Sequence, residues 1–105
     1  MTDQPAPAHS LESVWVVQAT YAPDAAETRV PLRTRHLARI ATLKAAGIIV
    51  VAGAYTDMSA SLLMVRAEDE AAAIEVARQD IYMQNAVWVE LRAKPFVQVV
   101  LDPAE

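Results

Sequence analysis

The chain has 105 residues, a length that supports one domain with a single hydrophobic core. Nine basic residues against thirteen acidic ones give a net charge of −4, which disfavours nucleic-acid binding. The sequence has no cysteine, which excludes disulfides, thiolate nucleophiles and cysteine-ligated metals. It has no run of about 18 apolar residues and no signal-peptide pattern at its start, so we expect a cytoplasmic protein that does not span a membrane.

The N-terminal part of the chain predicts a tail, a strand and a loop. Residues 1–12 are rich in proline and alanine and predict a disordered or frayed tail. The β-branched and aromatic run Ser13–Tyr21 predicts the first strand, which ends at an Ala-Pro-Asp turn signal. The polar residues 24–30 predict a loop that leads to the first helix.

The next segment predicts a helix followed by a β-hairpin. Pro31 suits the first turn of a helix over Leu32–Ala46, and Gly47 offers its C-cap. Ile48–Tyr55 is a short and nearly continuous β-branched run, which is typical of a strand covered on at least one face. Ser61–Ala67 predicts the following strand, and we expect the two strands to pair in an antiparallel hairpin.

The last part of the chain predicts a second helix and a long final strand. Asp69 is placed to cap a helix over Glu70–Gln79, whose acidic start complements the helix dipole and whose alanines favour helix formation. Residues 80–86 predict a loop or a short turn. Val87–Leu101 alternates as a strand, and Pro95 predicts a bulge or an edge position within it.

The predicted order is β-α-β-β-α-β, and right-handed crossovers turn this order into the ferredoxin-like plait. This is an α+β fold with a four-stranded antiparallel sheet and two helices on one face of the sheet. We place it over residues 13–101 as a single domain, with residues 102–105 as a short C-terminal tail.

The sheet face that the helices leave open predicts an interface. In the last strand, we expect Trp88 on the face opposite Val87, Val89 and Leu91, and residues 97–101 are more apolar than an exposed strand needs. Exposed apolar patches on the order of several hundred square ångströms mark interfaces in small soluble proteins. We therefore expect a homodimer whose two sheets pack against each other.

His36 is the first candidate for chemistry, because it interrupts an apolar helical stripe that includes Leu32, Ile40 and Leu43. Burying an imidazole without a partner costs about 1–3 kcal/mol, so the fold either satisfies this side chain or uses it. An imidazole titrates near neutrality and serves as a general acid or base. The alternative is a core histidine that is held by one carboxylate or carbonyl.

Asp80 is the candidate partner of His36. If the second helix continues to its end, Ala73, Ala77 and Asp80 share its apolar face, and the carboxylate points toward the sheet beside the other helix. A carboxylate at one ring nitrogen fixes the imidazole tautomer and leaves the other nitrogen free for a substrate. Asp80 is also suited to cap a turn over Ile81–Gln84, and the two roles are compatible.

Further polar side chains are candidates for binding a substrate at the rim of a pocket. Arg33 lies beside the His36 stripe and is suited to an anionic or phenolate oxygen, although a solvated helix arginine has the same pattern. Tyr82 either closes the pocket or packs in the core. The candidates at the hairpin, which turn chemistry also explains, are Tyr55, Asp57, Ser59 and Ser61. No metal-ligand spacing, phosphate loop or Ser/His/Asp order is present, so we expect no metal and no cofactor.

Four short motifs occur in order along the chain. They are Arg-His-Leu-Ala-Arg-Ile at 35–40, Leu-Lys-Ala-Ala-Gly at 43–47 followed by Val-Ala-Gly-Ala at 51–54, Asp-Ile-Tyr at 80–82, and Lys-Pro-Phe at 94–96. Together they resemble the YciI-like (YCII-related) family over residues 14–100. The resemblance implies a dimeric α+β barrel of ferredoxin-like subunits, with a cleft that holds a His–Asp dyad, here His36 and Asp80. Some relatives dehydrochlorinate chlorinated hydroxyquinols.

The sequence departs from the family pattern at two points. Ile81 stands where the family has a proline after its aspartate, which affects how rigidly Asp80 is held. The connection over residues 56–60 lacks the glycine that is common before the third strand, which leaves the identity of the substrate open.

Two functions remain open. The first is a small cofactor-independent enzyme of lyase or isomerase type, in which His36, oriented by Asp80, transfers a proton on a small cyclic or aromatic metabolite. The second is a non-catalytic dimeric module that binds a small ligand or acts as an accessory subunit, with the His–Asp pair as a structural hydrogen bond. Access separates them, because only the enzyme needs the free ring nitrogen of His36 to face a cleft.

Overall fold

The computed structural model of the protein describes residues 5–103. In this part of the chain, four strands and two longer helices follow the predicted order. The strands are β1 (His9–Tyr21), β2 (Ile49–Ala54), β3 (Ala60–Val65) and β4 (Trp88–Leu101). The helical segments are α1 (Ala25–Thr28), the 3₁₀ turn η1 (Val30–Leu32), α2 (Arg33–Ala45), α3 (Glu70–Arg78) and α4 (Ile81–Gln84). Two short helical turns, α1 and η1, are added to the predicted order, and α4 is the short turn that was predicted after the second helix.

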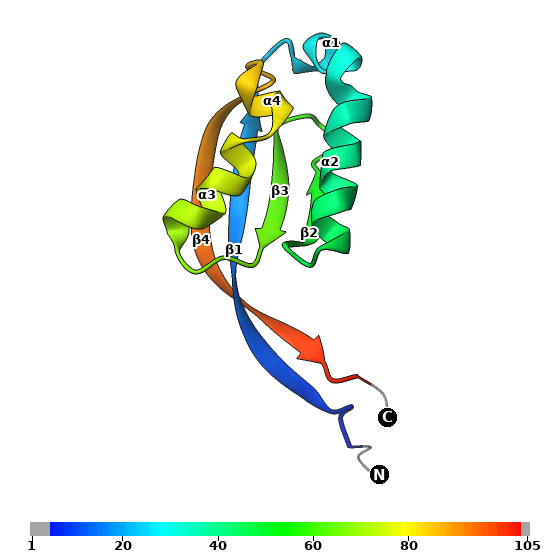
Figure 1. Cartoon of the computed structure of the whole chain (residues 1–105), viewed down its shortest axis with the longest axis vertical. Helices are drawn as coiled ribbons and strands as arrows, with labels where there is room; N and C mark the ends of the chain where they lie inside the picture. The colour runs from blue at the N-terminus through cyan, green and yellow to red at the C-terminus, as the bar shows by residue number, and fades with distance from the viewer. Residues whose placement is uncertain (1–4, 104–105) are drawn as a thin grey trace.

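The four strands form one antiparallel sheet in the order β2-β3-β1-β4. This order places each pair of parallel strands two positions apart with a helix crossing between them, so the predicted ferredoxin-like α+β plait is confirmed. Figure 1 shows the helices over one face of the sheet. No helix within residues 5–103 is long and apolar enough to cross a membrane.

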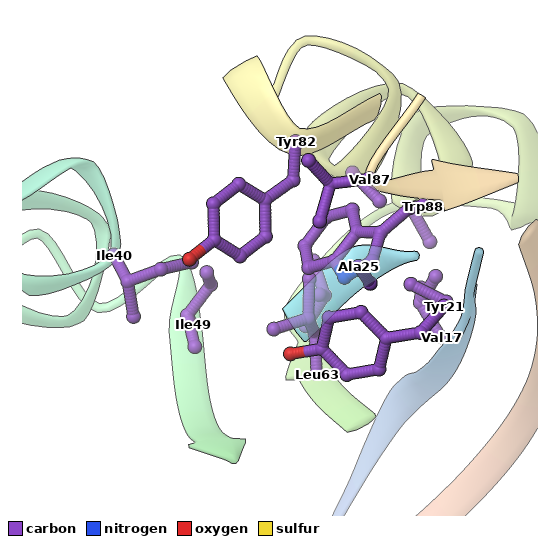
Figure 2. Close-up of a cluster of buried hydrophobic side chains, with 13 residues drawn as sticks. Val17, Tyr21, Ala25, Ile40, Ile49, Leu63, Tyr82, Val87 and Trp88 are labelled. Carbon is purple, nitrogen blue, oxygen red and sulfur yellow. The ribbon is translucent and has the colours of Figure 1, made fainter. Parts of the chain in front are cut away.

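The hydrophobic core lies between the helices and the sheet face that they cover. Along β1, Val17 and Tyr21 are buried on this face, and Leu63 of β3 joins them, as the two-residue period of a strand requires. Figure 2 shows these side chains together with Tyr82 and Trp88, which come from α4 and the start of β4. The aromatic part of the core is therefore gathered at one end of the sheet, next to α2.

Strand β1 begins at His9, so the prediction of a disordered or frayed tail over residues 1–12 is wrong for residues 9–12. They pair with the end of β4, where Leu11 lies opposite Val99. Residues 9–13 and 97–101 form a two-stranded ribbon that runs out beyond the helices (Figure 1). Strand pairing gives the backbone N–H and C=O groups of these residues hydrogen-bond partners, and composition alone does not reveal such pairing. The parts of the predicted tails at 1–4 and 104–105 lie outside the described residues.

The loop predicted over residues 24–30 is wrong, because it contains α1 and the start of η1. Pro31 lies in η1, one turn before α2, where its missing N–H costs no hydrogen bond. Gly47 follows α2 with a φ of +77°, as expected of a residue just past a helix end. Asp69 caps α3 as predicted, because its side chain accepts a hydrogen bond from the N–H of Ala72 at 2.8 Å.

The predicted faces of the last strand are wrong at its start. The pairing shifts between Thr20 and Tyr21, which lie opposite Glu90 and Trp88, so Val89 is left unpaired as a bulge. Trp88 therefore shares the helix-covered face with Tyr21 and is only 1% exposed, while Val89 is 52% exposed. Pro95 causes no bulge, because it sits on the edge strand β4, the other predicted option.

Candidate active site

Asp80 is placed by the start of α4, directly after α3. It is the N-cap of α4, and its Oδ1 accepts a hydrogen bond from the N–H of Tyr82 at 2.9 Å. The carboxyl group is fully buried. The capping role that the sequence suggested for Asp80 is confirmed, and it fixes the carboxylate at the junction between α4 and α2.

His36 lies on the inner face of α2 and meets this carboxylate. Its Nδ1 is 2.7 Å from Oδ1 of Asp80, and the side chain is buried. Because an ionised carboxylate only accepts hydrogen bonds, Nδ1 carries a proton and donates a hydrogen bond to Asp80. The other ring nitrogen, Nε2, makes no hydrogen bond to residues 5–103.

Arg39 binds the second oxygen of the same carboxylate. Its Nη1 donates to Oδ2 of Asp80 at 3.0 Å, and its Nη2 donates to the backbone carbonyl of Val76 at 2.8 Å. Burial by itself disfavours the ionised form of Asp80, but the hydrogen bonds from His36 and Tyr82 and the nearby Arg39 outweigh it and lower the pKa of this carboxyl. Asp80 is therefore an anion at neutral pH.

Two aromatic side chains hold the imidazole in its plane. The rings of His36 and Tyr82 stack with centroids 3.7 Å apart and planes within 8°. Trp88 presents an edge-on contact to both rings, at 5.3 and 5.6 Å between centroids. Burial, followed by the neighbouring Tyr21 phenol, raises the pKa of Tyr82, so its hydroxyl stays protonated at neutral pH.

A cavity of about 210 Å³ opens beside His36, and we call it the His36 cavity. Its walls come from Arg29 after α1, from α2, from the strands β1, β2 and β3, and from α4 and the start of β4. Apolar side chains form most of the wall. The polar lining residues are Tyr21, Arg29, Arg33, His36, Ser61 and Tyr82. Such a mostly apolar hollow with a few convergent polar groups is typical of a small-molecule site.

The structure brings together only some of the predicted site residues. Arg33, Ser61 and Tyr82 line the His36 cavity, whereas Tyr55 and Ser59 do not. Tyr55 is half exposed, and the N–H of Ser59 binds Asp57 Oδ1 within the β2–β3 turn at 2.9 Å. The alternative of turn chemistry therefore accounts for the position of Ser59.

Three polar or aromatic lining residues, Tyr21, Arg29 and Trp88, were not among the predicted site residues. Tyr21 closes the predicted first strand, and its inward face follows from the alternation with Val17, so a signal for it was present. Arg29 fell in the predicted loop, and Trp88 was placed on the wrong face of its strand. Among residues 5–103, no group of three or more His, Asp or Glu side chains is arranged to hold a metal.

The chain is similar to proteins of one family. The sequence model described as a YCII-related domain matches residues 13–97. Among solved structures, the chain resembles 5-chloro-2-hydroxyhydroquinone dehydrochlorinase from Burkholderia phenoliruptrix AC1100 in complex with 2,5-dihydroxybenzoquinone. That likeness has a TM-score of 0.66 and 20% sequence identity, and it covers 77% of this chain and 90% of the dehydrochlorinase chain. No curated protein sequence matches the chain.

Proposed function

The chain belongs to the YCII-related family, and on that premise we propose that it is a small cofactor-independent enzyme of lyase or isomerase type. Its substrate is a small cyclic or aromatic metabolite. The observation that carries the proposal is the position of His36, which lies between a buried carboxylate on one side and the His36 cavity on the other.

His36 has the arrangement of a general acid–base group. Its Nδ1 proton is held by Asp80, so Nε2 is the atom that accepts a proton from a molecule in the cavity. The imidazolium that forms is stabilised by the anionic Asp80, which has no need to take the proton itself. Proton transfer by a positioned group contributes about 10²–10⁴-fold to a rate, which is sufficient for an already acidic substrate.

The structural neighbour supports a ring-shaped substrate. The dehydrochlorinase was solved with a single six-membered ring bound, and its named reaction removes a hydrogen and a chlorine from such a ring. The His36 cavity, at about 210 Å³, suits a ligand of this kind rather than a polymer or a nucleotide.

The test compares the two histidines of the chain. Chloride release from 5-chloro-2-hydroxyhydroquinone is the first assay, followed by other hydroxylated rings. His36→Gln is expected to lower kcat/KM at least about 100-fold while circular dichroism shows an unchanged fold. His9→Gln is the matched control, since His9 lies in the ribbon, and it is expected to keep full activity. Equal activity of His36→Gln and the wild type would contradict the proposal.

A second candidate function is a non-catalytic ligand-binding or accessory module. Asp80 accepts hydrogen bonds from His36, Arg39 and the Tyr82 N–H. A His–Asp pair that only stabilises the fold would make the same hydrogen bonds. In that case, His36→Gln lowers the free energy of unfolding by roughly 1–3 kcal/mol and leaves ligand binding intact.

We also propose that the protein is a homodimer that forms through the sheet face without helices. This open face carries a largely apolar hollow of about 510 Å³. Its lining residues are Val16, Gln18, Val51, Leu62, Met64, Arg92, Lys94, Pro95 and Phe96. Val51 is 53% and Phe96 45% exposed, which favours a covering partner. Size-exclusion chromatography with light scattering is expected to give twice the chain mass of 11.4 kDa, whereas a monomer at micromolar concentration would overturn this proposal.

The proposed location is the cytoplasm. The absence of cysteine is compatible with this reducing compartment, and the family and its proposed chemistry need no oxidising one. Fractionation of cells that produce the untagged protein tests this location directly.

A further inference from the structure

Two buried hydroxyl groups face the same cavity as His36. Tyr21 comes from the end of β1, and Ser61 comes from the second position of β3, the neighbouring strand. Both side chains line the His36 cavity, and they are 8% and 4% exposed. Ser61 Oγ donates to Tyr21 Oη at 2.9 Å. In Figure 2, the hydroxyls of Tyr21 and Tyr82 point toward the same side, where α2 and β2 lie.

A count of protons shows that this pair has one donor to spare. Each hydroxyl brings one proton, but the two share a single hydrogen bond. Neither hydroxyl makes another hydrogen bond within residues 5–103. When Ser61 donates to Tyr21, the phenol proton of Tyr21 has no acceptor in this part of the chain. Buried polar hydrogens nearly always have a partner, so the cavity is where one is expected.

The charges around the cavity favour a negative partner. Arg29 and Arg33 line it as well, and neither guanidinium forms an ion pair with a carboxylate of the described residues. The carboxylate beside His36, Asp80, is already bound by His36 and Arg39. An oxygen that carries negative charge would therefore find a hydroxyl donor and two cations.

We propose that the Tyr21–Ser61 pair is the oxyanion-binding group of this site, and that the substrate is an oxygenated ring with an acidic C–H next to a carbonyl. This inference rests on the proposed function of His36. In the step, His36 Nε2 takes the proton from the carbon, and the C–H electron pair forms a carbon–carbon double bond. The carbonyl π electrons move to the oxygen, and the resulting enolate oxygen accepts the Tyr21 proton as a hydrogen bond. Return of the proton to carbon completes an isomerisation. In an elimination, the carbonyl re-forms, the electron pair of the carbon–carbon double bond shifts toward the next ring carbon, the bond from that carbon to the leaving group breaks, the group departs as an anion, and the proton stays on His36.

Binding measurements test this role separately from catalysis. The probes are 2,5-dihydroxybenzoquinone, an acidic enol that is an enolate in neutral water, and 4-nitrophenol, whose ionisation is read from its colour. Hydrogen bonds to charged groups are the strong ones, so Tyr21→Phe is expected to weaken enolate binding by about ten- to a hundred-fold. Ser61→Ala keeps the Tyr21 donor and is expected to weaken enolate binding less than Tyr21→Phe does. Tyr55→Phe removes a tyrosine hydroxyl that lies outside the cavity and is expected to leave enolate binding unchanged.

The ionisation of 4-nitrophenol separates oxyanion binding from packing. In the wild-type cavity, the bound probe is expected to ionise at a lower pH than in water, and Tyr21→Phe is expected to move this pH upward. His36→Gln is expected to keep enolate binding and lose turnover, so failure of the acid–base proposal remains distinguishable. The inference is overturned if Tyr21→Phe binds the enolate as tightly as the wild type, if the pH of ionisation is unchanged, or if the wild type binds neither probe.

Discussion

On the helix-covered face of the sheet, the buried side chains of Asp80, His36 and Ser61 each have a hydrogen-bond partner, whereas the open face surrounds a larger hollow with mostly apolar side chains. The first face holds Asp80 with His36 and Arg39 beside a cavity of about 210 Å³. The second has about 510 Å³, with walls that are mostly apolar. The larger hollow is suited to a protein surface, because its walls are mostly apolar, while the smaller one is lined by titratable and hydrogen-bonding side chains.

The largest effect is expected on the helix-covered face, where removal of the Asp80 carboxylate should lower the stability of the protein. Asp80→Ala deletes the cap of α4 and the partner of both His36 and Arg39. We expect a loss of about 3 kcal/mol in the free energy of unfolding, the lower end of the range for a broken buried pair because Arg39 is partly exposed. Urea denaturation measures it. Glu75→Ala, on the solvent side of α3, is the control and should stay within about 0.5 kcal/mol.

A charge placed on the open face tests whether this face forms the proposed dimer interface. Leu62→Asp places a carboxylate among apolar neighbours on β3, which opposes burial against a second copy but leaves the helix-side core untouched. We expect the mass in light scattering to fall from dimer to monomer, with the far-ultraviolet circular dichroism unchanged. Thr42→Asp, an exposed change on α2, should leave the mass as it is. A dimer that stays intact in Leu62→Asp would contradict the proposal that the open face is the dimer interface.

The pH dependence of stability should come from the helix-covered face. The pKa of Asp80 in the folded protein lies below its ordinary value of 3.8, so the folded state binds fewer protons than the unfolded state near that pH. The contribution of Asp80 is fully present above about pH 5 and is lost as the pH falls through the lowered pKa. Between pH 6 and pH 2, the free energy of unfolding should therefore fall more steeply with pH for the wild type than for Asp80→Ala. The same pH dependence in both proteins would show that Asp80 does not contribute to the pH dependence of stability.

The smallest expected effects lie outside both faces, at two helix ends with positive φ. Gly47 follows α2 at +77°, and Ala86 follows α4 at +56°. A side chain in this left-handed region costs roughly 1–2 kcal/mol, so Gly47→Ala should destabilise the protein by about 1 kcal/mol and Ala86→Gly should stabilise it by a similar amount. Thermal unfolding of the two variants gives the signs. Equal signs would mean that side-chain contacts, not backbone conformation, decide these positions.

Part of the candidate site was predictable from sequence because it depends on local periodicity. The spacing of Leu32, His36 and Ile40 turns the imidazole inward. The helical spacing predicted for Asp80 does not hold, because α3 ends at Arg78 and Asp80 is in an extended conformation as the N-cap of α4. The capping role, which the sequence also suggested, is what places the carboxylate. The 2.7 Å contact between His36 and Asp80 agrees with their predicted pairing, while their catalytic role stays a prediction. Arg39 was not predicted as a ligand of Asp80, since it lies off the inward stripe and reaches the carboxylate with a long side chain.

The sequence by itself determined the order of strands and helices, the fold class and the inward direction of His36, because each follows from local spacing and right-handed crossovers. Only the tertiary structure decided which face Trp88 takes, because the bulge at Val89 shifts the alternation by one residue. It also decided that the first residues of β1 join the ribbon with β4. The meeting of Tyr21 with Ser61 came from it as well, since strand pairing joins residues forty positions apart.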